Sequence, residues 1–171
     1  GLSWAVQNLD KLAGVTLIDT GVMPGFKWHS TARAWQTPVL GEVLQAVTTR
    51  AMFRWVTSKA EPRGLPREYL DEMYGNYDRR TRAAVLKLYR DLKAVAGQSD
   101  LIAMPLKDAD IPCLVIWGAH DRYLGPEFAE RQKEAFPSAE VHVLAESGHW
   151  PHIDDPATTT GLITRFLRRS E

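Results

Sequence analysis

The chain has 171 residues, of which 44% are hydrophobic and 25% charged, a composition typical of one globular domain with a sizeable core. Its 21 Lys and Arg residues balance its 21 Asp and Glu residues, so no overall field would attract nucleic acid or a membrane, and we expect neither as a partner. A single cysteine, Cys113, excludes an internal disulfide framework and a multi-cysteine zinc site. We expect a cytoplasmic protein, although the chain begins at Gly1 and any signal peptide would lie outside it.

Residues 1–22 combine the patterns of a helix and a buried strand. Leu2, Ala5, Val6 and Leu9 recur at the spacing of one helical face. The run GVTLIDTG follows, and it is short, mostly apolar and bounded by glycines. This segment therefore predicts a helix that leads into a buried strand.

The composition changes over residues 23–108, where Trp, Tyr and Arg are frequent and prolines interrupt the chain. The periodic runs here are helical: LGEVLQAVTTRAMFRWV, PREYLDEMYGNY with Pro66 in the first turn, and TRAAVLKLYRDLKAVAG, which ends at Gly97. These patterns predict an all-helical insertion.

Strands and helices alternate again over residues 109–171. IPCLVIWG and AEVHVLA have the pattern of strands, whereas GPEFAERQKEAF and DPATTTGLITRFLRR have the pattern of helices. The last helix has Asp155 as its N-cap candidate and Pro156 in its first turn. Such alternation indicates an α/β fold, a parallel sheet with helices on both faces.

Two polar residues follow the last two predicted strands. Asp121 comes after IPCLVIWG, and His149 comes after AEVHVLA. Because functional groups gather at the carboxyl ends of parallel strands, neighbouring strands would bring these side chains together. A carboxylate that accepts from one imidazole nitrogen leaves the other nitrogen free to act as a base. The pair therefore predicts the acid and base of a catalytic triad.

Each residue also has a simpler interpretation. Aspartate often caps a helix or closes a turn in such a loop, and a lone histidine in a loop is often only a polar surface residue. The joint placement of Asp121 and His149 after two strands favours the catalytic interpretation. Five histidines could also suggest zinc, but the chain has no His-x-x-x-His pair and no cysteine cluster, so we expect no metal.

IPCLVIWGAHDRYLGPE and SGHWPHIDDPATTTGLITRFL resemble the C-terminal half of a capped α/β-hydrolase, the group that includes haloalkane dehalogenases, epoxide hydrolases and ester or carbon–carbon bond hydrolases. The resemblance implies a core of residues 1–22 and 109–171, a helical cap of residues 23–108, and no cofactor. It implies that Asp121 is the acid and His149 the histidine. Some dehalogenases place the acid at the position of Asp19 instead, which we interpret here as a strand-end residue.

Aromatic residues in the cap suggest a small, mostly apolar substrate. Trp28 is one of these residues, and the resemblance adds Trp150 and Leu124 as pocket walls. Most cap aromatics could instead pack the cap's own helices. A cap tyrosine aimed at His149 would favour an epoxide substrate.

Ser3, in the opening GLSWA, is not expected to be the nucleophile. Only Gly1 and Leu2 precede it, so no strand could present its hydroxyl, and it shares the polar helix face with Gln7 and Asp10. The family order puts the nucleophile about half a dozen residues before Gly1, so we expect the chain to require its own N-terminal half and to be inactive alone. A serine there would give an acyl-enzyme, and an aspartate would open a haloalkane or epoxide. The alternative is an inactive hydrolase-fold fragment that acts as a binding or structural module.

Overall fold

The structure, a computed structural model, describes residues 1–22, 28–59, 61–94 and 99–169. It divides into two compact units. The core unit contains Gly1–Pro24, Ala60–Arg63 and Gln98–Glu171, and the helical unit contains Gly25–Lys59 and Gly64–Gly97. Residues 60–63 and 98–108 thus group with the core, although their sequence patterns place them in the insertion.

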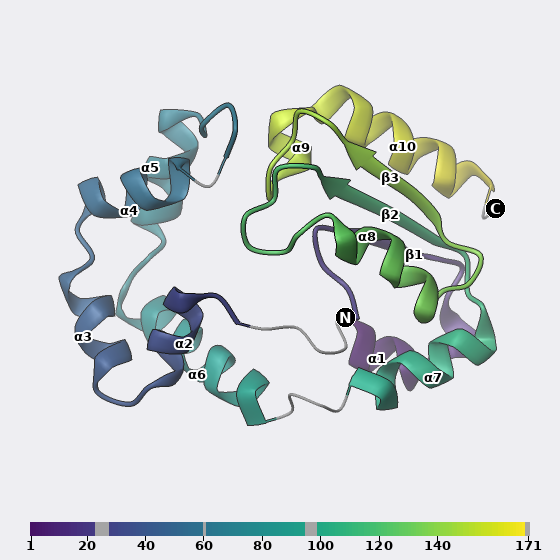
Figure 1. The fold of residues 1–171 in the computed structure, drawn as a ribbon, viewed down its shortest axis with the longest axis horizontal. Coiled ribbons are helices and arrows are strands. Elements are labelled where there is room, and N and C mark those ends of the chain that lie inside the picture. The colour runs from purple at the N-terminus through teal and green to yellow at the C-terminus, as the bar shows by residue number, and fades with distance from the viewer. Residues whose placement is uncertain (23–27, 60, 95–98, 170–171) are drawn as a thin grey trace. The chain divides into compact units, whose positions relative to one another are not determined.

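The core unit holds a three-stranded parallel sheet in the order β1-β2-β3 (Figure 1). Val15 of β1 lies opposite Cys113 of β2, and Ile116 of β2 lies opposite His142 of β3. In chain order the elements are α1 (Leu2–Val6), η1 (Leu9–Lys11), β1 (Val15–Ile18), α7 (Ser99–Ala109), β2 (Cys113–Gly118), α8 (Glu127–Arg131), η2 (Gln132–Glu134), β3 (Glu140–Leu144), α9 (Pro151–Asp154) and α10 (Pro156–Arg169).

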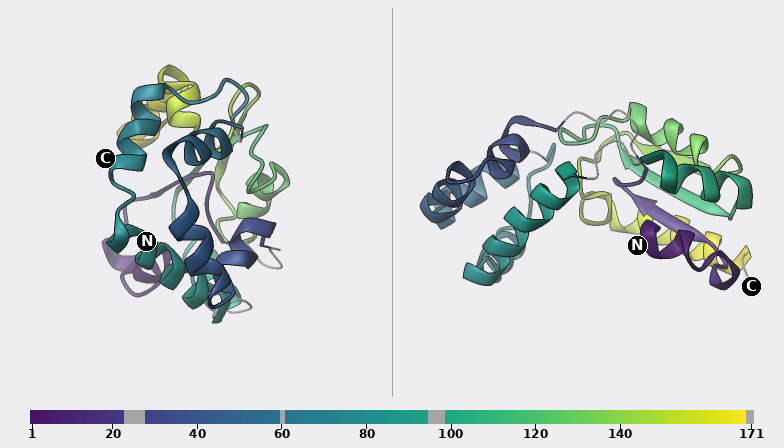
Figure 2. Two further views of the ribbon diagram at one scale, coloured as in Figure 1. Left: turned by 90° about the vertical axis from the view of Figure 1, so that its left-hand side faces the viewer. Right: turned by 90° about the horizontal axis from the view of Figure 1, so that it is seen from below.

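The central strand β2 is buried along its whole length because helices cover both faces of the sheet. Val115 and Trp117 pack in one core cluster together with residues of α1, α7 and α8. Leu114 and Ile116 point the other way and pack against α10. Helices α8 and α10 accordingly lie on opposite sides of the sheet (Figure 2). This arrangement confirms the predicted α/β class.

Local capping explains where the last helix begins. The Asp155 carboxylate accepts a hydrogen bond from the Thr158 amide at 3.1 Å, and Pro156 is the first residue of α10. Both positions agree with the sequence pattern. The predicted helix over GPEFAERQKEAF is instead divided into α8 and the single 3₁₀ turn η2, at the fully buried Gln132.

The helical unit contains α2 (Ser30–Gln36), α3 (Leu40–Val47), α4 (Arg50–Ser58), α5 (Arg67–Gly75) and α6 (Arg79–Ala94). The periodic run over residues 40–56 is therefore not one helix. Thr48 is extended, and the Thr49 hydroxyl caps α4 by accepting from the Met52 amide at 3.3 Å. Pro66 is the N-cap of α5 and lies just before its first turn. Gly97, the expected end of α6, is outside the described residues.

Among the residues that the structure describes, no helix combines the length and the apolar character needed to cross a membrane.

Candidate functional site

The site lies at the carboxyl ends of β2 and β3, where two loops run side by side. The Ala119 amide donates to the Leu144 carbonyl and the His120 amide to the Ser147 carbonyl, both at 3.0 Å. The loops approach so closely that a Cβ atom on Gly118 would lie 1.9 Å from the Gly148 carbonyl oxygen. Only glycine fits at position 118, and this contact sets the spacing of the two loops.

Asp121 and His149 meet across these loops. The imidazole Nδ1 lies 2.8 Å from Asp121 Oδ2, within hydrogen-bond distance. Asp121 Oδ1 also accepts from the Tyr123 amide at 2.7 Å and from the Leu124 amide at 3.0 Å. Asp121 therefore closes the turn with one carboxylate oxygen and bonds to the imidazole with the other.

The imidazole has one nitrogen available for chemistry. A carboxylate only accepts hydrogen bonds, so the imidazole donates from Nδ1, and in the neutral imidazole Nε2 then has the lone pair. The His149 side chain is 25% exposed, whereas the Asp121 side chain is fully buried. Tyr123 and Trp150 contact the imidazole edge to face, with ring centroids 5.0 and 5.1 Å away. These aromatic rings fix the plane of the imidazole and leave part of it open.

A second carboxyl group, Asp19, lies directly beneath this pair. It follows β1, has a positive φ of 44°, and is only 2% exposed. Its Oδ1 accepts from the Gly118 amide at 2.9 Å, and its Oδ2 is buried beside the Asp121 carboxylate. The pKa of Asp19 is raised to about 9, chiefly because the carboxyl is buried; the Gly118 amide lowers the pKa and the nearby Asp121 adds to the increase. Asp19 therefore carries a proton at neutral pH.

Asp19, Asp121 and His149 each offer one possible ligand atom, and these atoms lie within 4.8 Å of one another. Such spacing is close enough for a cation. Two of the three atoms, His149 Nδ1 and Asp121 Oδ2, share a hydrogen bond with each other. The residues that could hold a cation thus include the hydrogen-bonded pair itself.

The sequence did not identify Glu61, which also lies at the site. This residue is 6% exposed, and its Oε1 accepts from the His149 backbone amide at 3.0 Å. The pKa of Glu61 is raised to about 8, chiefly because the carboxyl is buried; the carboxyl groups of Asp154 and Asp121 add to the increase and the His149 amide opposes it. Glu61 is distant in sequence from every other site residue and stands in no motif, so no local pattern could indicate this contact.

The three expected wall residues have different positions. Trp150 precedes α9 and contacts the His149 ring, as described above. Leu124 packs against the core, and its carbonyl accepts from the Trp117 indole N–H at 2.9 Å. Trp28 belongs to the helical unit, where its ring contacts Tyr89 edge to face at 5.4 Å. That contact agrees with the interpretation that cap aromatics pack the cap's own helices.

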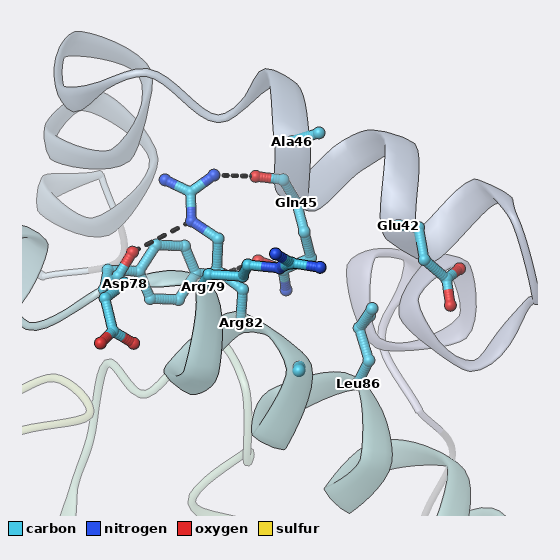
Figure 3. A pocket seen from close by; sticks show the side chains of 9 residues that line it. Glu42, Gln45, Ala46, Asp78, Arg79, Arg82 and Leu86 are labelled. Atoms are coloured by element: carbon cyan, nitrogen blue, oxygen red, sulfur yellow. Dashed lines mark hydrogen bonds between the residues drawn. The ribbon is translucent and has the colours of Figure 1, made fainter.

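The helical unit has a pocket of its own, with a volume of about 500 Å³ (Figure 3). The Arg82 guanidinium crosses it and donates to the backbone carbonyls of Tyr77 and Gln45, and the Tyr77 hydroxyl donates to the Gln45 side chain. The polar groups of the pocket are thus largely engaged with one another. Its lining residues are Glu42, Gln45, Ala46, Tyr77, Asp78, Arg79, Arg82, Ala83 and Leu86.

Comparison with known families gives one match that spans most of the chain. The model of the alpha/beta hydrolase family matches residues 2–160. A curated relative, the 2-hydroxy-6-oxononadienedioate/2-hydroxy-6-oxononatrienedioate hydrolase of a Pseudomonas species, is 28% identical over 108 residues, which are 63% of this chain and 38% of the relative. Esterase YbfF of Escherichia coli K12 is 34% identical over 58 residues, which are 34% of this chain and 23% of the esterase.

Solved structures share the fold at low sequence identity. Haloalkane dehalogenase DbeA of Bradyrhizobium elkani USDA94 has a TM-score of 0.77 and 20% identity, over 98% of this chain and 64% of the dehalogenase. The 2-hydroxy-6-oxo-6-phenylhexa-2,4-dienoate hydrolase of Rhodococcus sp. RHA1 has a TM-score of 0.76 and 18% identity, over 98% of this chain and 59% of that hydrolase. The chain therefore spans less than two thirds of each of these proteins.

Proposed function

Because this chain belongs to the alpha/beta hydrolase family, we propose that it supplies the acid and the base of a hydrolase triad, with Asp121 as the acid and His149 as the base. The observation that carries the proposal is the 2.8 Å hydrogen bond between His149 Nδ1 and the buried Asp121 carboxylate. The nucleophile would come from a part of the hydrolase fold outside these 171 residues. The chain would then need that part in order to act.

The proposed reaction starts with a proton transfer to His149. Nε2 takes the proton of a serine hydroxyl as the serine oxygen bonds to the substrate carbonyl carbon, and then gives that proton to the departing alcohol. In the second half, Nε2 takes a proton from water, the hydroxide attacks the acyl-enzyme, and the proton returns to the serine oxygen. Asp121 stabilises the imidazolium in both halves. The cycle needs no cofactor or metal.

The substrate that we propose is a small, mostly apolar ester. Its support is the aromatic surrounding of the imidazole, formed by Tyr123 and Trp150, together with the esterase among the relatives. Leu124 remains a proposed wall of the pocket in the core unit.

A haloalkane or an epoxide is the second candidate, favoured by the likeness to haloalkane dehalogenase DbeA. In that case an aspartate would displace the halide or open the epoxide, and His149 would activate water to hydrolyse the alkyl ester. Loss of His149 would then trap the alkyl-enzyme instead of preventing its formation. Mass spectrometry of a His149→Phe variant after exposure to 1-chlorobutane or styrene oxide distinguishes this branch.

The test of the main proposal uses p-nitrophenyl butyrate as substrate. The enzyme tested, called the longer protein below, consists of these 171 residues joined to the part of the hydrolase fold that would supply the nucleophile. We expect His149→Ala and Asp121→Asn to lower kcat by about 10³- to 10⁴-fold, because each removes part of one proton-transfer unit. His142→Ala is the matched control, since His142 bonds to Glu140 on β3 and should leave kcat unchanged. A His149→Ala variant with normal kcat would overturn the proposal.

The 171-residue chain alone should not hydrolyse the ester. Turnover by the isolated chain that His149→Ala abolishes would show that the nucleophile lies within it. If the longer protein is also inactive on esters, haloalkanes and epoxides, the alternative of a binding or structural module is favoured.

A further inference from the structure

We propose that Glu61 is a positioning residue, which holds the loop that carries His149 and so fixes the imidazole against Asp121. The inference rests on the proposed role of His149 as the base. Glu61 comes from residues 60–63, a short part of the core unit that lies in sequence between two helices of the helical unit, α4 and α5.

Two consecutive amides of the histidine loop are each held by a carboxyl group. The His149 amide donates to Glu61 Oε1 at 3.0 Å, and the Gly148 amide donates to Asp154 Oδ2 at 2.7 Å. Arg63 adds a third link, because its guanidinium donates to the Asp154 backbone carbonyl at 3.2 Å. The peptide unit that precedes the imidazole is therefore fixed from two separate segments.

Glu61 and the loop fit closely because Gly148 has no side chain. A Cβ atom at position 148 would lie 2.1 Å from Glu61 Oε2 and 2.8 Å from Pro62 Cδ. A methyl group would displace the Glu61 carboxyl, since that carboxyl ends a flexible side chain. Gly148→Ala thus removes the contact without altering Glu61 itself.

The charges around Glu61 make the contact sensitive to pH. The carboxyl groups of Asp154 and Asp121 face it, and the Arg63 guanidinium and the His149 and His152 imidazoles lie on the segments packed around it. Since the pKa of Glu61 is raised to about 8, the residue is neutral at pH 7 and ionises as the pH rises through 8. Because the pKa is raised only while the loop is closed, the closed loop loses stability as the pH rises from about 4.5 to about 8, and the effect levels off above pH 8.

The experiment measures two properties of the longer protein: kcat and KM for the ester, and the low-field proton resonance of the His149 Nδ1–H. We expect Glu61→Ala and Gly148→Ala to lower kcat by about 10- to 100-fold with little change in KM, and to broaden the resonance, because the imidazole loses its fixed orientation. Glu61→Gln should keep both properties near those of the wild type and abolish the change of the resonance between about pH 4.5 and pH 8. Glu146→Gln is the matched control, since Glu146 is exposed in the same loop.

The outcomes separate this inference from the proposed function. A normal resonance and normal kcat in Glu61→Ala, or an equal loss in Glu61→Gln and Glu61→Ala, would overturn the positioning role. If His149→Ala has no effect on hydrolysis, the proposed function fails, and the resonance alone then decides whether Glu61 positions the imidazole. Should Glu61→Ala fail to fold, Gly148→Ala and Glu61→Gln give the same comparison.

Discussion

Replacing Asp19 with asparagine tests whether the buried cluster holds a proton. The folded chain keeps Asp19 protonated at pH 7, because its pKa is raised from 3.8 to about 9, whereas the unfolded chain ionises it. Each pKa unit corresponds to about 1.4 kcal/mol, so ionisation favours the unfolded chain by about 4 kcal/mol at pH 7. Asparagine cannot ionise and therefore removes this cost.

The hydrogen bonds of Asp19 should survive the substitution. An amide oxygen can accept from the Gly118 amide as Oδ1 does, and the amide NH₂ can donate toward Asp121. We therefore expect Asp19→Asn to raise the free energy of unfolding of the core unit by about 2 to 4 kcal/mol at pH 7. The gain should vanish near pH 4, where both states hold the proton, grow as the pH rises, and level off above pH 9.

Hydrogen exchange of the β2 amides is the suitable assay, because these amides are buried in the core unit and exchange when it opens. Wild type, Asp19→Asn and Asp10→Asn are compared at pH 5, 7 and 9, with Asp10 as the exposed control. A variant that is no more stable than the wild type at pH 7, with a difference independent of pH, would refute the assignment of the proton to Asp19.

Two further substitutions test how the core unit is held together. Gly118→Ala should lower the free energy of unfolding of the core unit by about 3 kcal/mol or more, because a Cβ atom cannot fit between the two loops. It should also abolish the low-field resonance of the His149 Nδ1–H. The control is Gly75→Ala, which has no atom nearby and should leave thermal unfolding unchanged. Gln132→Leu should lower the free energy of unfolding, measured in urea, by about 2 to 4 kcal/mol, because the buried Gln132 amide bonds to both the N–H and the C=O of Val22. Gln7→Leu is the control, since Gln7 is exposed. Equal effects of either variant and its control would contradict the reasoning.

The pairing of Asp121 with His149 could be predicted because each residue directly follows a strand that the local sequence pattern indicates. β2 is a short apolar run bounded by turn residues, and Asp121 and His149 follow their strands directly. Parallel pairing of neighbouring strands then leaves little freedom for where the two side chains meet. The sequence alone indicated the approximate position of the hydrogen bond that carries the proposed function.

Contacts between distant segments could not be predicted in this way. Gln132 bonds to Val22, which is 110 residues away, and Glu61 bonds to His149, which is 88 residues away. No periodicity encodes either contact. Helix α7 lies almost entirely within the residues predicted to be helical, although it contains Pro105.

The carboxyl groups around His149 show how the fold arranges charge in a chain with no net charge. Asp121 accepts three hydrogen bonds, two from backbone amides and one from the imidazole, whereas Asp19 and Glu61 are more weakly stabilised as anions and have raised pKa values of about 9 and 8. Burial thus leaves Glu61 and Asp19 with raised pKa values beside the hydrogen bond between Asp121 and His149, and each of these two carboxyl groups loses its proton above the usual range of a carboxyl group. Glu61→Gln and Asp19→Asn remove these two events separately, and a site built in this way should show both in the wild type and only the remaining one in each variant.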